Sequence, residues 1–261
     1  MTGVSAVDMT DAAPAHRRAR WPWVLLIVVV LLAALVVAAE FLARSILPGI
    51  VRGIVVEQLD LPADQQLDVE ADGVLLPQLI GGTLDELHLS TDRVTLEGLT
   101  GAVDVTATGV SLRGDGLAAA TGVVRLAEDE FPALLARTEL PIEQISLAEP
   151  DATATGAVQV FGIDIPISLT LTPGAEDGDV LLTPIAISVG GAQLDAEQVR
   201  DRLGAIGETI TQTQRICVAD QLPAGLTITD LRIEGSTAVA EVAVDGAIIA
   251  DEALQRPGTC G

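Results

Sequence analysis

The stretch IDIPISLTL, residues Ile163–Leu171, places an aliphatic side chain at every second position. Because successive side chains of a β-strand point to opposite faces, this alternation predicts a strand with one dry and one wet face. A sheet that has one solvated face is typically antiparallel. Pro166 has no N–H to donate to a neighbouring strand, so we expect an edge strand or a bulged one.

The same period of two recurs on both sides of this stretch. Val180–Val189 is expected to pair with it across the turn Pro173–Asp179, and Gly235-Ser236 to join a last hairpin. Its two strands are predicted at Leu226–Glu234 and Ala238–Ile249. The remaining strands are predicted at Leu67–Ala71, Leu84–Leu89, Val94–Leu99, Val103–Leu112 and Leu117–Leu126. Consecutive hairpins favour an antiparallel sheet, and with about three helices they indicate an α+β fold.

The predicted helices are Phe41–Leu59, Glu128–Thr138 and a third that covers Asp195–Ile206 or is somewhat longer. In the first, Ile46, Ile50 and Ile54 recur at the four-residue spacing of a helical stripe. Pro48 predicts a kink or the start of a new helix there. The heptad Val74–Ile80 is too apolar for an ordinary surface turn, so it is expected to be a short buried helix or a loop that enters the core.

An apolar run, Trp21–Ala39, precedes all of these segments. It has 19 residues and no charge, close to the length of about 20 that spans a bilayer. Arg17, Arg18 and Arg20 lie directly before it, and positive residues remain on the cytoplasmic side. We therefore expect a cytoplasmic tail at 1–20, a single-pass signal-anchor in the cell membrane at 21–39, and an extracytoplasmic domain at 40–261. The alternative is a cleaved signal peptide, for which Val37-Ala38-Ala39 supplies small residues.

The exported part is strongly acidic. Removing the tail's three arginines and two aspartates from 14 basic and 37 acidic residues leaves a net charge near −24. Such a surface repels nucleic acid, which excludes that class of partner. Cys217 and Cys260 are the only cysteines. In an oxidising compartment an even count indicates one disulfide, and metal ligation or a redox pair are the alternatives.

Signatures of catalysis are absent from the sequence. The exported part has one histidine, His88, no tyrosine and no Gly-x-Ser-x-Gly motif. A zinc hydrolase needs more histidines at defined spacing. Glu176-Asp177-Gly178-Asp179 lacks the length of a calcium loop, so a solvated turn is the simpler interpretation. We expect neither an enzyme nor a protein with a metal or another cofactor.

What remains is aliphatic surface with few aromatic rings. The structural interpretation is an ordinary core, and the functional one is a cavity for acyl chains lined by the inner face of the sheet and the first helix. The candidate lining residues are Ile46, Ile50, Ile54, Leu75, Leu79, Ile80, Ile163, Ile165, Ile167 and Leu169.

The order of these segments resembles that of the LmeA-like family of actinobacterial cell-envelope proteins. The similarity lies in Asp72–Asp85, in Val103–Val110, and in Cys217 followed by Leu222–Ile228. The resemblance implies a long antiparallel sheet rolled around a helix, as in one half of a tubular lipid-binding fold. It also implies phospholipid as the partner and a role in envelope lipid or glycolipid maturation. The alternative function is a non-enzymatic scaffold for envelope or cell-wall biosynthesis enzymes that has no lipid cavity.

Overall fold

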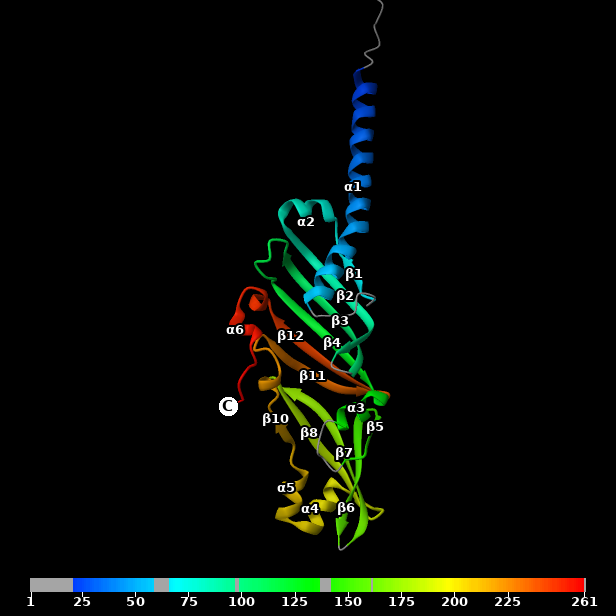
Figure 1. Cartoon of the computed structure of the whole chain (residues 1–261), viewed down its shortest axis with the longest axis vertical. Coiled ribbons are helices and arrows are strands. Elements are labelled where there is room, and N and C mark those ends of the chain that lie inside the picture. Colours follow the sequence, from blue (N-terminus) through cyan, green and yellow to red (C-terminus); the bar gives the residue numbers. More distant parts are fainter. Residues whose placement is uncertain (1–20, 59–65, 97–98, 137–141, 161, 261) are drawn as a thin grey trace, which may run out of the picture. The chain divides into compact units, whose positions relative to one another are not determined.

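The computed structural model describes residues 21–58, 66–96, 99–136, 142–160 and 162–260 (Figure 1). The chain forms two compact units, Met1–Leu42 and Ala43–Gly261. The predicted α+β class is confirmed, because an N-terminal apolar helix is followed by antiparallel sheets and short helices.

Helix α1 covers Trp21–Gln58 and continues through Pro48, so no new helix begins at the proline. Its segment Leu25–Glu57 is long and apolar enough to cross a membrane. Aliphatic side chains are exposed on all sides of its first turns, from Leu25 at 55% to Val37 at 68%. A helix that is apolar all round fits a lipid environment, and so fits a membrane anchor or a signal sequence. The predicted tail, 1–20, and Leu59 lie outside the described residues.

Six strands form the first sheet, here called sheet A. In spatial order they are β1 (Asp68–Ala71), β2 (Thr83–Leu96), β3 (Leu99–Ser111), β4 (Ala119–Ala127), β12 (Thr237–Asp245) and β11 (Leu226–Glu234). All neighbours are antiparallel. Pairing of β4 with β12 brings together segments that are more than 100 positions apart. The predicted strands Leu84–Leu89 and Val94–Leu99 fall largely within β2, which carries an irregularity between Thr91 and Val94.

The strands between β4 and β11 form a second antiparallel sheet, sheet B, so the long antiparallel sheet that the resemblance implies is divided into two. Its spatial order is β10 (Gln214–Ile216), β8 (Asp179–Val189), β7 (Ile163–Glu176), β6 (Asp151–Val160) and β5 (Gln144–Ala148). A further strand, β9 (Ala192–Asp195), also pairs with β8. The sheets are separate because the edge of β4 is occupied by β12, so β5 pairs with β6 instead.

The alternating stretch Ile163–Leu171 begins β7, which lies between β6 and β8 and is not an edge strand. Its bulge lies between Thr170 and Leu171. Pro166 is tolerated because the pairing with β8 ends at Val189. The proline carbonyl there accepts the N–H of Gly190, at 2.9 Å, in the turn beyond β8. In an antiparallel strand the N–H and the carbonyl of one residue point toward the same neighbouring strand. The N–H that Pro166 lacks would therefore point toward the β8 side, where the pairing with β8 has already ended.

The sheets meet at the turn of the β11–β12 hairpin. The N–H of Glu149, after β5, donates to the carbonyl of Gly235 at 3.2 Å, and the N–H of Glu128 donates to Ser236 at 3.1 Å. The carboxylate of Glu128 also accepts the N–H of Leu147, at 2.7 Å. β11 packs against β7, and Ile233, Val239 and Leu147 are buried. The junction between the sheets is therefore closed by hydrogen bonds and by apolar burial.

Several short helices differ from those predicted. Glu128–Thr138 appears as a 3₁₀ turn, η1 (Glu128–Glu130), and α3 (Phe131–Leu135); its last two residues lie outside the described residues. Asp195–Ile206 is split at Gly204, whose φ is 57°, into α4 (Ala196–Leu203) and α5 (Ala205–Thr211). The last strand ends at Asp245 rather than Ile249, because the Asp245 carboxylate caps a 3₁₀ helix, η3 (Gly246–Ile249). Two further short elements are η2 (Ala219–Gln221) and α6 (Glu252–Gln255).

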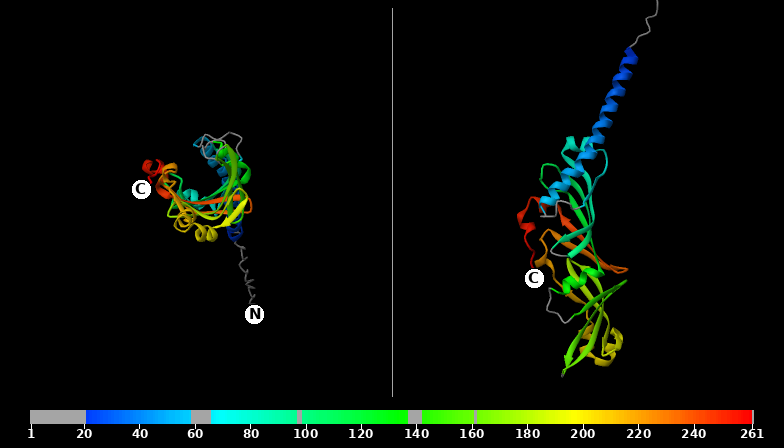
Figure 2. Two further views of the ribbon diagram at one scale, coloured as in Figure 1. Left: turned by 90° about the horizontal axis from the view of Figure 1, so that it is seen from below. Right: turned by 45° about the vertical axis from the view of Figure 1, so that its right-hand side comes forward.

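The principal apolar cluster forms where α1 meets sheet A. Its buried members are Val69, Leu75, Leu84 and Leu87. From α1, the residues that pack against it are Ala43, Leu47 and Val51, a stripe at four-residue spacing. Figure 2 shows these later turns of α1 running beside β1 and β2. The helix therefore covers only one end of the six-stranded sheet.

Candidate functional site: an aliphatic sheet face

The strand register of sheet A aligns aliphatic residues into rows that cross the sheet. One row runs through Leu89, Val105, Gly122, Val242 and Ile228. The rows beside it consist of Leu87, Ala107, Ala120, Val244 and Leu226 on one side, and of Thr91, Val103, Val124, Ala240 and Leu231 on the other. We call the face that carries these three rows the aliphatic face. It is almost free of polar side chains over five strands.

The opposite face of the same strands is polar. Its rows contain His88, Thr106, Thr121 and Thr227 in one, and Ser90, Asp104, Glu241 and Asp230 in the next. His88 donates or accepts a hydrogen bond with the hydroxyl of Thr106 at 3.1 Å, and its Nε2 lies 3.5 Å from Asp104. Arg125 also pairs with Asp104, at 2.5 Å. His88 therefore belongs to a polar network on the face of sheet A opposite the aliphatic face.

Much of the aliphatic face is only partly covered. Leu87, Ala107 and Ala120 are buried, near the end of the sheet that α1 covers. Six other aliphatic residues of this face are intermediate in exposure. They are Val103, Val105, Val242, Val244, Ile228 and Leu231. Val124 is 39% exposed. Valines and leucines in a filled core are normally buried, so this face offers apolar surface that a ligand can cover.

The length of the aliphatic face suits an acyl chain. Five strands spaced about 4.8 Å apart span roughly 19 Å. One leaflet of a bilayer, half of a hydrocarbon core about 30 Å thick, is about 15 Å deep. An extended acyl chain that lies across the strands would therefore find apolar contacts along its whole length.

A cavity of about 350 Å³ lies at the end of sheet A beside α1. Its lining comes from α1, β1 and the start of α2, with Arg44, Leu47, Pro48, Val69, Glu70, Ala71, Asp72 and Leu75. Its volume is at the low end for small-molecule sites. The mixed lining, with a guanidinium, carboxylates and aliphatic side chains, suits a group with a polar and an apolar part.

The predicted lining residues are distributed over three places. Ile46, Ile50 and Ile54 are exposed by 51%, 55% and 54%, on the side of α1 next to the Ala43–Leu47–Val51 stripe. Leu75 is buried in the principal cluster, while Leu79 and Ile80 face outward from α2 (Leu75–Gly81). Ile163, Ile165, Ile167 and Leu169 belong to sheet B, in which Leu169 pairs with Ala154 and Ile187. Leu75 packs in the same cluster as Leu87 and Leu89 of the aliphatic face, whereas the four residues of β7 lie in the other sheet.

The residues of β3, β4, β11 and β12 on the aliphatic face were not among those predicted. The signal was present, since Val103, Val105 and Ala107 alternate in the same way as Ala240, Val242 and Val244. Alternation alone does not say which strands are neighbours. Only the register shows that these residues lie in common rows.

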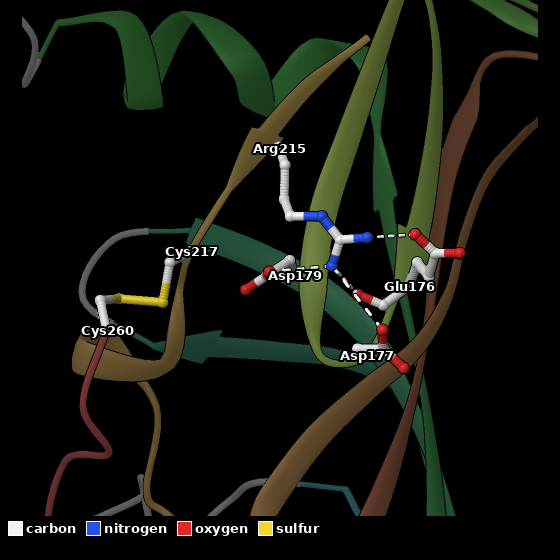
Figure 3. A network of polar contacts seen from close by, with 6 residues as sticks. All are labelled: Glu176, Asp177, Asp179, Arg215, Cys217 and Cys260. Carbon is white, nitrogen blue, oxygen red and sulfur yellow. Dashed lines mark hydrogen bonds and ion pairs between the residues drawn. A yellow bond between two sulfur atoms is a disulfide. The ribbon is translucent and has the colours of Figure 1, made fainter.

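Sheet B carries a second polar centre around Arg215 (Figure 3). Arg215 pairs with Glu176, with Asp179 at 3.2 Å and with Asp177 at 3.8 Å, so the acidic turn is bound by one guanidinium. Its hydrogen bond to Asp179, with the field of all three carboxylates, raises the pKa of Arg215. Within the described part of the chain, no group of three histidines, cysteines or carboxylates is arranged to hold a metal ion.

The two cysteines form a disulfide two residues beyond Arg215. The bond between Cys217 and Cys260 closes a sequence separation of 43 and attaches the C-terminal segment to the strand that holds Arg215. Beside it, a cavity of about 550 Å³ is lined by Asp177, Leu222, Pro223, Pro257 and their neighbours. The disulfide thus attaches the segment beyond α6 to the residue that follows β10.

Comparison with known families gives one match. The model of the LmeA-like phospholipid-binding family matches residues 38–241, which is most of the chain and contains nearly all of the aliphatic face. Comparisons with curated proteins and with solved structures found no match. Because the family model covers far more than half of its length, the chain belongs to the LmeA-like phospholipid-binding family.

Proposed function

We propose that this protein is a membrane-anchored, extracytoplasmic and non-enzymatic phospholipid carrier, whose aliphatic face holds the acyl chains. The observation that supports this most is the set of three aliphatic rows that cross five strands and are only partly covered. Family membership supports phospholipid as the ligand. The apolar, exposed first turns of α1 support the anchor.

The energetics favour exchange of lipid over extraction. Transfer of an acyl chain from water to an apolar surface gains about 0.8 kcal/mol per methylene. The chains in a bilayer are already removed from water, so the net gain relative to the membrane is close to zero. A face of this kind therefore takes up and returns phospholipid, which suits a supporting role in maturation of envelope lipids or glycolipids.

The test compares adjacent residues that lie on opposite faces of β4. Val124 belongs to the aliphatic face, while Val123 lies between Asp104 and Glu241 on the polar face. In Val124→Asn, the amide meets acyl chains without a hydrogen-bond partner, which costs about 1–3 kcal/mol and weakens binding by roughly 5- to 150-fold. Val123→Asn is the matched control and retains the wild-type affinity.

The measurement uses the Glu40–Gly261 domain, since Ala43–Gly261 is a compact unit with its own core. Native mass spectrometry reports co-purified lipid, and uptake of a fluorescent phospholipid reports affinity. Absence of both from the wild-type domain would contradict the proposal and favour a scaffold without a lipid site. Equal effects of the two substitutions would show that lipid binds elsewhere.

A further inference from the structure

Helix α2 buries one leucine and one glutamine but turns several of its other aliphatic side chains outward. The buried positions hold Leu75 and Gln78, exposed by 1% and 7%. Ile80 is 85% exposed, Val74 at its start is 58% exposed, and Leu79 is 36% exposed. A helix on the surface of a soluble domain normally turns its aliphatic side chains inward.

Specific hydrogen bonds hold α2 in this orientation. Nε2 of Gln78 donates to the carbonyl of Asp72 at 2.8 Å, and its Oε1 accepts the N–H of Asp85 at 3.0 Å. At the other end, Gly82 is left-handed with φ 80°, and its N–H donates to the carbonyl of Gln78 at 2.8 Å. The buried glutamine is thus satisfied as donor and acceptor, which fixes Ile80 on the outside.

The turn after β3 extends the same apolar surface. The N–H of Leu112 donates to the carbonyl of Gly82 at 3.0 Å, and the Leu112 side chain is 42% exposed. Arg113 follows it and lies beside Gly82. We call Val74, Leu79, Ile80 and Leu112 the α2 edge; Figure 1 shows α2 and this turn at the same end of sheet A.

Chain connectivity indicates what covers the α2 edge. The compact domain begins at Ala43, shortly after the apolar run Trp21–Ala39. Arg44, the next residue, donates a hydrogen bond to the carbonyl of Gly73, the residue before Val74. The α2 edge is therefore tied to the point where the chain leaves the anchor. Two of the few arginines in an acidic domain, Arg44 and Arg113, flank it, where they can meet lipid phosphates.

We propose that the α2 edge docks on the outer leaflet of the bilayer, with Ile80 and its apolar neighbours inserted below the headgroups. An amphipathic surface of this kind enters the boundary between headgroups and acyl chains. The docking rests on the retained anchor of the proposed function, and not on lipid binding by the aliphatic face. It would fix which end of sheet A is presented to the membrane.

The experiment places a fluorescent label on the full-length chain in phosphatidylcholine vesicles. Cys217 and Cys260 form a disulfide, so an introduced cysteine supplies the only free thiol. Ile80→Cys carries an environment-sensitive dye on the α2 edge. Ile163→Cys is the matched control, because Ile163 is also an exposed isoleucine, at 68%, but lies in sheet B. Leu112→Cys gives a second position on the α2 edge.

Docking predicts that the label at 80 is blue-shifted and loses most of its emission when spin-labelled phosphatidylcholine is added. The label at 112 responds in the same direction, and the label at 163 is quenched only by aqueous iodide. Equal iodide quenching at all three positions, with no response to the spin-labelled lipid, would overturn the proposal. The result is independent of lipid uptake by the Glu40–Gly261 domain, so each proposal can fail alone.

Discussion

Gly122 of β4 is paired directly with Val242 of β12, in the middle row of the aliphatic face. It is the only position of that row without a side chain. A Cβ placed on Gly122 would lie 3.9 Å from its nearest heavy atoms, the carbonyl oxygen of Asp104 and a methyl of Val105. A methyl group therefore fits at the centre of the row, whereas a longer side chain there would extend over the aliphatic face, and this gives the first prediction.

Gly122→Leu is expected to block lipid uptake while the domain remains folded. The leucine would occupy the centre of the aliphatic face, where an acyl chain crosses the strands. Gly122→Ala is the control, because one methyl group makes only ordinary contacts at 3.9 Å. Fluorescent phospholipid binding and thermal unfolding should be measured on both variants. Undiminished uptake by Gly122→Leu would remove the aliphatic face as the lipid site.

Helix α1 offers a comparison between its packed and its exposed stripes. Leu47 packs against the principal cluster, whereas Ile50 is 55% exposed. Leu47→Ala should destabilise the domain by about 2 kcal/mol, at the low end for a leucine truncation because the side chain is only partly buried. Ile50→Ala should cost less than about 1 kcal/mol, and urea unfolding distinguishes the two. The sequence pattern placed Ile50 among the residues that line the lipid site. If that prediction holds, Ile50→Ala loses lipid affinity while its stability stays close to that of the wild type.

Removal of the disulfide should lower stability substantially. A loop closed by a sequence separation of 43 is worth up to about 4 kcal/mol on the loop-entropy model. The double variant Cys217→Ser/Cys260→Ser should therefore unfold at lower urea concentration than the oxidised protein. The wild-type protein with its disulfide reduced should unfold at the same urea concentration as this variant. If the double variant unfolds at the same urea concentration as the oxidised protein, the C-terminal segment is held by its other contacts alone.

The buried amide of Gln78 should be required for the position of α2. Gln78→Leu leaves the carbonyl of Asp72 and the N–H of Asp85 without that partner, at an expected cost of about 1–3 kcal/mol. Hydrogen exchange at Asp85 should rise in this variant, because its amide is no longer protected. The exposed Leu79→Ser, on the same helix, should leave that exchange unchanged.

Arg215 should contribute a stability that does not vary over the neutral pH range. Its pairing with Asp179 and the neighbouring carboxylates raises its pKa in the folded state. A raised folded-state pKa gives a contribution that is complete below the pKa of an unfolded arginine, far above neutral pH, and is lost only above it. Arg215→Gln should therefore lower the unfolding temperature equally at pH 6 and pH 9, and added salt should reduce the difference because the pairs are exposed. A difference that grew strongly with pH would contradict this assignment.

The sequence by itself determined the local structure of this protein. Alternation in Ile163–Leu171 and Val103–Leu112 predicted strands with a dry and a wet face, because side chains alternate along any strand. The uncharged run Trp21–Ala39 predicted a helix of membrane-spanning length, and the two cysteines predicted one disulfide. Short-range rules suffice for the strands and the helix, since each depends on neighbours within a few residues, and the disulfide follows from the count of two cysteines.

Only the tertiary structure decided which strands are neighbours and what their faces meet. Alternation gives no register, so nothing local shows that Val105, Gly122 and Val242 share a row, or that β12 takes the edge of β4 and separates two sheets. The heptad Val74–Ile80 was expected to be buried because it is apolar. In the structure Gln78 takes the inner position and Ile80 the outer one, because hydrogen bonds to Asp72 and Asp85 orient the helix. Contacts between distant segments, which no local pattern encodes, therefore determine where this protein exposes its aliphatic surface.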